Sequence, residues 1–350
     1  MRKISEVFIN GVCLEKILED HNNWLEEKGG RRADLSEADL NNVDLRNLDL
    51  NGIILTGANL FSANLSNTKL TSVNLKGADL RCAKLNNSIL FCANLKGADL
   101  FRANLVKASL FSANLIETDL RCANLRSANL RYANLSEANL NYANLKEVSL
   151  RYACSNNTDF SYANLEKADL KYISLNNSNL NYANLNDANL ESAGLIETDL
   201  SYADLKFTCL KYTVLFEANL RGANLEYADL SHANLNCANL SRAYLSYANL
   251  ENAYLRFSNL EFTVLDNACL KYVDFKGANL NCAYLFGTDL TGAQFIEANL
   301  KGADLRKAYL KFTSLEDSDL RYADFNGTNL IYTNLEGANL EGANLEGVNL

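Results

Sequence analysis

The residues that could do chemistry in this 350-residue chain are 42 acids, nine cysteines and only two histidines. The cysteines include no C-x-x-C pair, so neither a zinc site nor a disulfide framework is indicated. His21 has no second histidine, cysteine or carboxylate cluster near it in the sequence, and His232 is expected at an outward position. The sequence also has no glycine-rich phosphate loop, HExxH motif or nucleophile elbow. We therefore expect no catalysis, no cofactor and no metal.

Tyrosine and basic residues recur at intervals of 20 residues in the middle of the chain, and this composition is favoured at binding hot spots. Two explanations stay open: stacked rings with flanking cations that only stabilise the fold, or a patch that binds a partner. One series is Tyr142, Tyr162, Tyr182 and Tyr202; a second is Tyr132, Tyr152, Tyr172 and Tyr212, broken by Ser192 and accompanied by Arg131, Arg151 and Lys171.

Acidic residues are concentrated in every fourth group of five, starting with residues 36–40, where 16 acids stand against 4 bases. This acidic side is either a solvated face that keeps the protein soluble or an anionic surface offered to a basic groove. Outward acids have no burial to tune them as acid/base pairs. Its candidate binding residues are Asp79, Asp99, Glu117, Asp119, Glu137, Asp159, Glu197 and Asp199.

These residues are positioned by an unbroken repeat of five. From Arg31 to Leu350 the chain divides into 64 pentads; position 5 is leucine in 59, position 3 is alanine in 41, and position 4 is Asp or Asn in 45. Neither a helix period of 3.6 nor a strand period of 2 accommodates this pattern. We expect the chain to bend every five residues, with positions 3 and 5 inside and the other three facing water. The exceptions at position 5 are Ser155, Phe160, Phe275, Phe295 and Phe325.

The motif A-(D/N)-L-x-x, as in SEADL, TGANL, KGADL and EGANL, resembles the pentapeptide-repeat family over 320 of the 350 residues. The resemblance implies an all-β fold, a right-handed quadrilateral β-helix with four pentads per coil and a dry core of stacked Leu or Phe. About 16 coils at a strand spacing of roughly 4.8 Å would make a rod about 77 Å long. Each coil would contact only its neighbours.

The two ends of the repeat differ. Residues 1–30 are predicted to form a capping segment, with a helix within 13–28 that places Leu14, Ile17, Leu18, His21 and Leu25 on one stripe beside Trp24. Residues 31–350 are predicted to form the β-helix, and its last pentads have no apolar helix after them. That edge is either blunted by glycines and glutamates or pairs with a second copy, giving a monomer or an end-to-end dimer.

One pentad, RYACS, places Ser155 where leucine belongs, and the next supplies Phe160. The extra volume beside a deficit suggests local compensation. We expect the Ser155 hydroxyl to be buried or linked to water.

Overall charge narrows the function. A net charge of −9 and a pI near 5.0 argue against direct nucleic-acid binding. No apolar run is long enough to span a membrane and the first residues lack a signal-peptide stretch, so we expect a cytoplasmic protein with no membrane partner. The leading hypothesis is a non-catalytic structural rod or protein-binding rod.

The alternative comes from the resemblance, because some bacterial pentapeptide-repeat proteins mimic DNA. They bind type II topoisomerases such as gyrase and protect or inhibit them, which implies a quinolone-resistance-like role. The chain shares their repeat and has an acidic side. It lacks the inserted loops of one branch and the C-terminal dimerising helix of such mimics.

Overall fold

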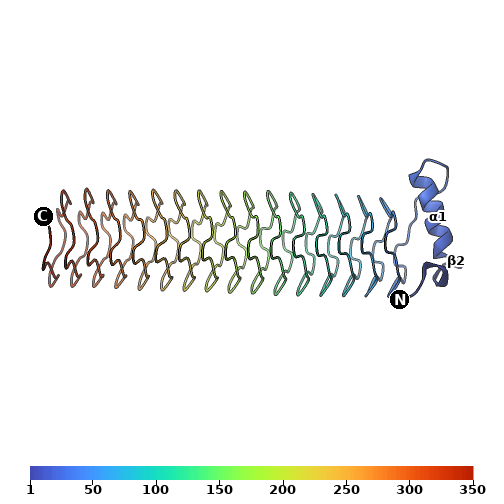
Figure 1. Cartoon of the computed structure of the whole chain (residues 1–350), viewed down its shortest axis with the longest axis horizontal. Helices are drawn as coiled ribbons and strands as arrows, with labels where there is room; N and C mark the ends of the chain where they lie inside the picture. The colour runs from blue at the N-terminus through green and yellow to red at the C-terminus, as the bar shows by residue number, and fades with distance from the viewer. Residues whose placement is uncertain (350) are drawn as a thin grey trace. The chain divides into compact units, whose positions relative to one another are not determined.

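The computed structural model describes residues 1–349 as two compact units, Met1–Ser174 and a second unit that begins at Leu175. In each unit the backbone forms a stack of similar coils (Figure 1). Leu350, the last position 5 of the repeat, lies outside the described residues. The coils are described below for each unit by itself.

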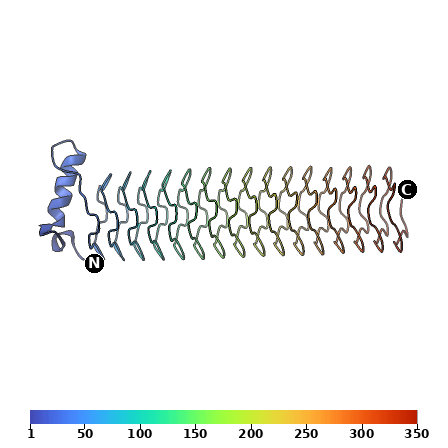
Figure 2. The same ribbon diagram turned by 180° about the vertical axis from the view of Figure 1, so that it is seen from behind.

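The first unit opens with a short non-repetitive segment. It contains the 3-10 helix η1 (Ile4–Glu6), the strands β1 (Phe8–Ile9) and β2 (Val12–Cys13), which pair antiparallel, and the helix α1 (Leu14–Leu25). The helix lies inside the predicted range 13–28. Nothing in the repeat pattern predicts η1 or the hairpin. Figure 2 shows this segment beside the first coils of its unit.

Helix α1 packs its apolar stripe against the start of the repeat. Leu14, Leu18 and His21 are buried, and Trp24 stacks on His21 with ring centroids 5.4 Å apart. The Nδ1 atom of His21 accepts a hydrogen bond from the backbone N–H of Ala33 at 3.2 Å. A single histidine thus ties the helix to the first pentads, and burial lowers its pKa below the ordinary value of 6.5.

Successive coils pair through position 4. The parallel bridges join residues 20 apart, as in Asp34↔Ile54 and Asp39↔Asn59 of the first unit and Asn219↔Asn239 of the second. Each turn of this β-helical solenoid therefore contains four pentads. Positions 1 and 2 form a turn, so the pairing consists of rows of single-residue bridges and not of extended strands.

Every backbone N–H of a typical pentad has a partner. In residues 96–100 the N–H groups of positions 2, 4 and 5 donate to carbonyls of neighbouring coils at 2.7–3.0 Å, and that of position 3 donates to the leucine carbonyl three residues earlier at 2.9 Å. The position-1 N–H of Lys96 donates to Oδ1 of Asn94 at 3.2 Å. Asp and Asn are thus favoured at position 4 because they satisfy the one donor that the coils leave over. The expectation that position 4 simply faces water is wrong: many of these side chains are half-buried.

The turn explains the residue types at position 2. This position has a φ of about +50 to +70° in the repeat, for example +65° at Gly97 and +59° at Tyr132, while position 1 does not. Together with the hydrogen bond from position 3 to the preceding leucine, this is the pattern of a type II turn, which favours Gly or Asn. Tyrosine at position 2 therefore carries a backbone cost of about 1–2 kcal/mol.

The core follows the prediction. Position-5 leucines and position-3 alanines are almost fully buried throughout both units, apart from the last described pentads, where Leu345 is 48% exposed. Phe275 and Phe295 stack in the core of the second unit, with centroids 4.7 Å apart. Ser155 is fully buried, as predicted, and Phe160 is 1% exposed. Within residues 1–349, no helix is long and apolar enough to cross a membrane.

Candidate protein-binding surface

Five aromatic rings form a continuous ladder on one side of the first unit. We call residues 91–95, 111–115, 131–135, 151–155 and 171–174 the aromatic-basic side. The ladder begins with Phe91 and Phe111, whose centroids lie 6.0 Å apart, and Phe111 meets Tyr132 edge-on at 5.4 Å. Tyr132, Tyr152 and Tyr172 then stack almost parallel, at 5.0 and 4.9 Å. The three tyrosines belong to the predicted series, whereas the two phenylalanines do not.

The phenylalanines were missed because they occupy position 1 and the tyrosines occupy position 2. Both positions lie in the same turn, so a ring at either position reaches the same corner of the coil. The available signal was aromatic residues in consecutive pentads of one side, irrespective of position. The tyrosine rings remain exposed, Tyr132 by 47%, despite the unfavourable backbone conformation of position 2.

The basic residues beside the ladder have few partners. Arg131 makes no ion pair or side-chain hydrogen bond with any residue from 1 to 349, although its guanidinium lies 5.9 Å from the ring centroid of Tyr132. The nearest ion pair of Arg151 is to Asp169, with Nε and Oδ2 3.8 Å apart. The Nε atoms of both arginines are buried without a hydrogen-bond acceptor. The aromatic-basic side contains no Asp or Glu at all.

The other predicted tyrosine series is divided between the two units. In the first unit Tyr142 and Tyr162 stack at 4.9 Å, and in the second Tyr182 and Tyr202 stack at 5.1 Å. Tyr212, beyond the break at Ser192, stacks on the outward-facing His232 at 4.9 Å. These stacks are shorter than the five-ring ladder.

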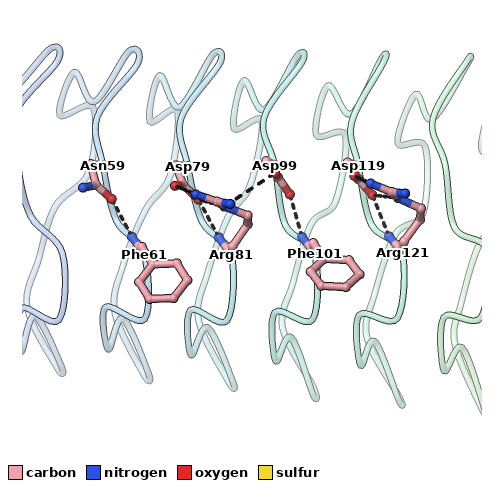
Figure 3. Close-up of polar contacts among 8 residues, drawn as sticks. All are labelled: Asn59, Phe61, Asp79, Arg81, Asp99, Phe101, Asp119 and Arg121. Atoms are coloured by element: carbon pink, nitrogen blue, oxygen red, sulfur yellow. Dashed lines mark hydrogen bonds and ion pairs between the residues drawn. The ribbon is translucent and has the colours of Figure 1, made fainter.

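The acidic side is partly neutralised by arginines from the next corner (Figure 3). Arg81 forms two hydrogen bonds to Asp79, at 2.8 and 2.6 Å, and lies 3.7 Å from Asp99. Arg121 pairs with Asp119 in the same way. Hydrogen bonding to Arg81 holds the pKa of Asp79 below its ordinary value. The arginines also lie over phenylalanine rings, as Arg81 does over Phe61 at 5.6 Å.

The remaining predicted acids have varied surroundings. Glu117 pairs with Lys96 at 3.0 Å, and Asp159 accepts hydrogen bonds from the backbone and hydroxyl of Ser161. In the second unit Asp199 accepts from the backbone N–H of Ser201 at 3.0 Å and from the Asn219 amide. Glu137 and Glu197 form no ion pair within the described part of the chain. The row is therefore less anionic than its composition suggests.

The described residues bring together no catalytic or metal-binding constellation. No group of three or more His, Cys, Asp or Glu side chains that could hold a metal occurs in residues 1–349. The nine cysteines are free thiols. The arrangement offers recognition chemistry instead: aromatic faces, guanidinium donors and flat rows of amides.

A second exposed apolar set in the second unit also escaped the sequence analysis. Tyr244, Val264 and Tyr284 occupy position 4 of three consecutive coils, where Asp or Asn is usual, and Tyr244 is 50% exposed. Arg242 lies over the Phe262 ring beside them, 5.6 Å from its centroid. The signal was present as three non-Asx residues 20 positions apart.

Comparison with known proteins identifies the repeat. The family model described as "Pentapeptide repeats (8 copies)" matches overlapping segments that together cover residues 31–195, 213–281 and 283–347. No curated protein matches the chain.

Similar solved structures include three pentapeptide-type proteins. QnrB1, a plasmid-mediated fluoroquinolone resistance protein, is 21% identical over 52% of this chain and 84% of its own, with a TM-score of 0.38. HetL, involved in heterocyst differentiation regulation in the cyanobacterium Nostoc sp. strain PCC 7120, is 28% identical over 86% of this chain and 94% of its own, with a TM-score of 0.17. Rfr23 from the cyanobacterium Cyanothece 51142 is 33% identical over 31% of this chain and 65% of its own, with a TM-score of 0.11. With TM-scores this low, no partner is inferred from them.

Proposed function

Because the chain belongs to the pentapeptide-repeat family, we propose that it is a non-catalytic scaffold that binds another protein through the aromatic-basic side of its first unit. In this proposal the coils wind right-handed and number about 16, and the protein acts in the cytoplasm as a monomer or an end-to-end dimer. It uses no metal or cofactor.

The observation that carries the proposal is the five-ring ladder beside two guanidinium groups that lack a good carboxylate partner. Exposed aromatic rings cost solvation, tyrosine at position 2 costs backbone energy, and a buried Nε without an acceptor costs a hydrogen bond. Stacking within the ladder offsets part of this. A partner that covers the rings and supplies acceptors offsets the rest, and clusters of Tyr with Arg are the usual centres of protein interfaces.

The test is quantitative affinity capture from the native cell extract, followed by binding measurements with the purified captured protein. The test variant changes Tyr132, Tyr152 and Arg151 to serine. The matched control changes Phe61, Phe101 and Arg121, which form a similar aromatic and arginine corner on another edge of the same unit. We expect the partner to be lost with the test variant alone, while circular dichroism stays unchanged for both. Equal loss with the control variant, or undiminished capture by the test variant, would refute the surface assignment.

The second candidate function is DNA mimicry towards a type II topoisomerase such as gyrase, favoured by the excess of 12 acidic charges on the acidic side. The ion pairs of Asp79 with Arg81 and of Asp119 with Arg121 count against it, because they remove charge where duplex DNA has one charge per about 1.7 Å. We therefore rank it below protein binding through the aromatic-basic side.

A further inference from the structure

Arg131 and Arg151 differ from other arginines at position 1. Five of these form a two-pronged pair with the aspartate two residues earlier, at the preceding position 4; they are Arg46, Arg81, Arg121, Arg306 and Arg321. Arg131 instead follows Asn129, and Arg151 follows Ser149. Two successive coils thus carry a guanidinium fork from which the internal carboxylate has been omitted.

The missing group defines the chemistry of the ligand. A guanidinium presents a planar fork that matches the two oxygens of a carboxylate, as the five internal pairs illustrate. No acid on the aromatic-basic side competes for these donors. The five rings alongside offer an apolar surface. A ligand that satisfies both features carries carboxylates along one edge and apolar side chains along the other.

The spacing selects the backbone conformation of such a ligand. The rings repeat every 5.0 and 4.9 Å along the stack, so two steps span roughly 10 Å. On an α-helix, residues i, i+3 and i+7 rise by about 4.5 and 10.5 Å at 1.5 Å per residue. On a strand, alternate residues lie about 6.6 Å apart and reach about 13 Å after two steps. The helix stays in register with the ladder, whereas the strand is about 3 Å out after two coils.

Strand addition is also disfavoured by the backbone. In a pentad such as 96–100, all five N–H groups already donate, to neighbouring coils, to the turn or to an Asn side chain. The side of a coil therefore offers no row of free donors to an extended peptide. Recognition on this side must use side chains.

From these observations we infer that the aromatic-basic side binds an acidic amphipathic α-helix of a partner protein, lying along the direction in which the coils stack. Its carboxylates at i, i+3 or i+4, and i+7 pair with Arg131 and Arg151, and its apolar residues pack on the rings of Tyr132, Tyr152 and Phe111. A long polyanion such as duplex DNA is repelled by the net charge of −9, whereas a short helix presents negative charge only where the arginines are. The inference rests on the proposed function, since it specifies the partner of the same surface.

The test uses designed peptides as probes and fluorescence anisotropy as the readout. The first probe is a hydrocarbon-stapled 18-residue helix with glutamates at i, i+3 and i+7 and leucines on the adjacent stripe. Three matched probes are the same helix with glutamine for glutamate, an extended peptide of the same composition with alternating glutamates and two prolines, and a 20-base-pair DNA duplex. The proteins are the wild type, the double variant R131Q/R151Q and the matched control R81Q/R121Q, whose arginines already have internal partners.

We expect the acidic helix to bind the wild type and R81Q/R121Q within twofold of each other. Binding should fall at least tenfold with R131Q/R151Q, at least tenfold with the glutamine helix, and further as salt rises, because partly exposed ion pairs are screened. The glutamine helix tests the charge contacts on unaltered protein, so a folding defect in a variant cannot decide the result.

The inference is overturned if the acidic helix does not bind at 1 mM, if the extended peptide or the duplex binds as tightly, or if R81Q/R121Q weakens binding equally. Any of these outcomes leaves the capture experiment unaffected, since a partner could still be lost with the Tyr132, Tyr152 and Arg151 variant. Conversely, loss of capture with both corner variants would refute the proposed function itself.

Discussion

The Oδ1 atom of Asp266 accepts a hydrogen bond from the backbone N–H of Phe286, one coil further along, at 3.1 Å. Phe286 follows Tyr284, which stands at position 4 and has no acceptor for this N–H. The acceptor therefore comes from position 1 of the preceding coil. The same replacement occurs between Asn236 and Arg256, next to Tyr254, at 2.8 Å.

Replacing Asp266 separates the hydrogen bond from the charge. Burial raises the pKa of Asp266, so the folded state binds the proton more tightly than the unfolded state does, and its stability contribution falls as pH rises from about 3.8 through the folded pKa. We expect Asp266→Asn, which keeps the acceptor without the charge, to match or exceed wild-type stability at pH 7. Asp266→Ala should lose about 1 kcal/mol, the usual value of such a cap. Urea unfolding at pH 4 and 7 measures both, and equal losses for Asn and Ala would contradict the role of the acceptor.

Core and cap residues of the second unit should differ in their effects. Leu200 is fully buried, and Leu200→Ala should cost about 2–5 kcal/mol through lost burial and a residual cavity. Asn224 accepts from the Glu226 N–H at 3.1 Å, so Asn224→Ala should cost about 1 kcal/mol and Asn224→Asp much less. Chemical denaturation of the three variants gives the order, and similar losses for Leu200 and Asn224 would contradict the assignment of inward and outward positions.

The sequence was sufficient for the core and insufficient for the contacts at the corners. Leu200 and its equivalents were predictable because burial repeats every five residues in the letters themselves. Asp79 and Arg81 were assigned to different sides, yet the turn between them places them in contact, so counting charge by side overestimated the acidic row. The use of Asp266 in place of a missing position-4 acceptor depends on a neighbour 20 residues away. Such contacts follow from three-dimensional register and not from the local pattern.

Helix α1 should loosen in acid. His21 accepts the Ala33 N–H through Nδ1 and is fully buried, and burial lowers its pKa below 6.5. The unfolded state therefore binds the proton more tightly, so the stability contributed by His21 is present above about pH 6.5 and is lost as pH falls through the folded pKa. We expect hydrogen exchange in residues 14–25 to accelerate, relative to the coils, below that pH. His21→Gln should abolish this dependence and His232→Gln should retain it; the reverse result would sink the assignment.

Ser155 and Phe160 should be coupled. Ser155 has no exposed surface, and Ser155→Leu places three additional heavy atoms in a closed core, which typically costs about 1–3 kcal/mol. If Phe160 compensates for the small serine, the double variant with Phe160→Leu restores two ordinary leucines and recovers much of the loss. Thermal unfolding of the two single variants and the double variant measures the coupling. A higher melting temperature for Ser155→Leu alone would indicate an unfilled space instead.

The acidic side should not inhibit or protect gyrase. Its charge is diluted by internal ion pairs such as Arg81 with Asp79, so we expect no change in DNA supercoiling or quinolone sensitivity with micromolar protein at low or moderate salt. A salt-sensitive effect would reverse the ranking of the two functions if it disappeared when Asp99, Glu117, Asp119 and Glu137 were changed to Asn or Gln. An effect that survived those changes would have to come from another surface.

The four-pentad turn makes chain length act in two different ways. Removing 20 residues from a unit deletes one whole coil and leaves every later side chain above its former neighbours. Removing five, for example residues 121–125, turns everything after the cut by a quarter revolution. Phe91 and Phe111 would then face a different direction from Tyr132, and the ladder would be divided although no ring had been altered. Surfaces of this kind are thus inherited intact through duplication or loss of whole turns, and a single lost pentad is equivalent to many simultaneous surface mutations.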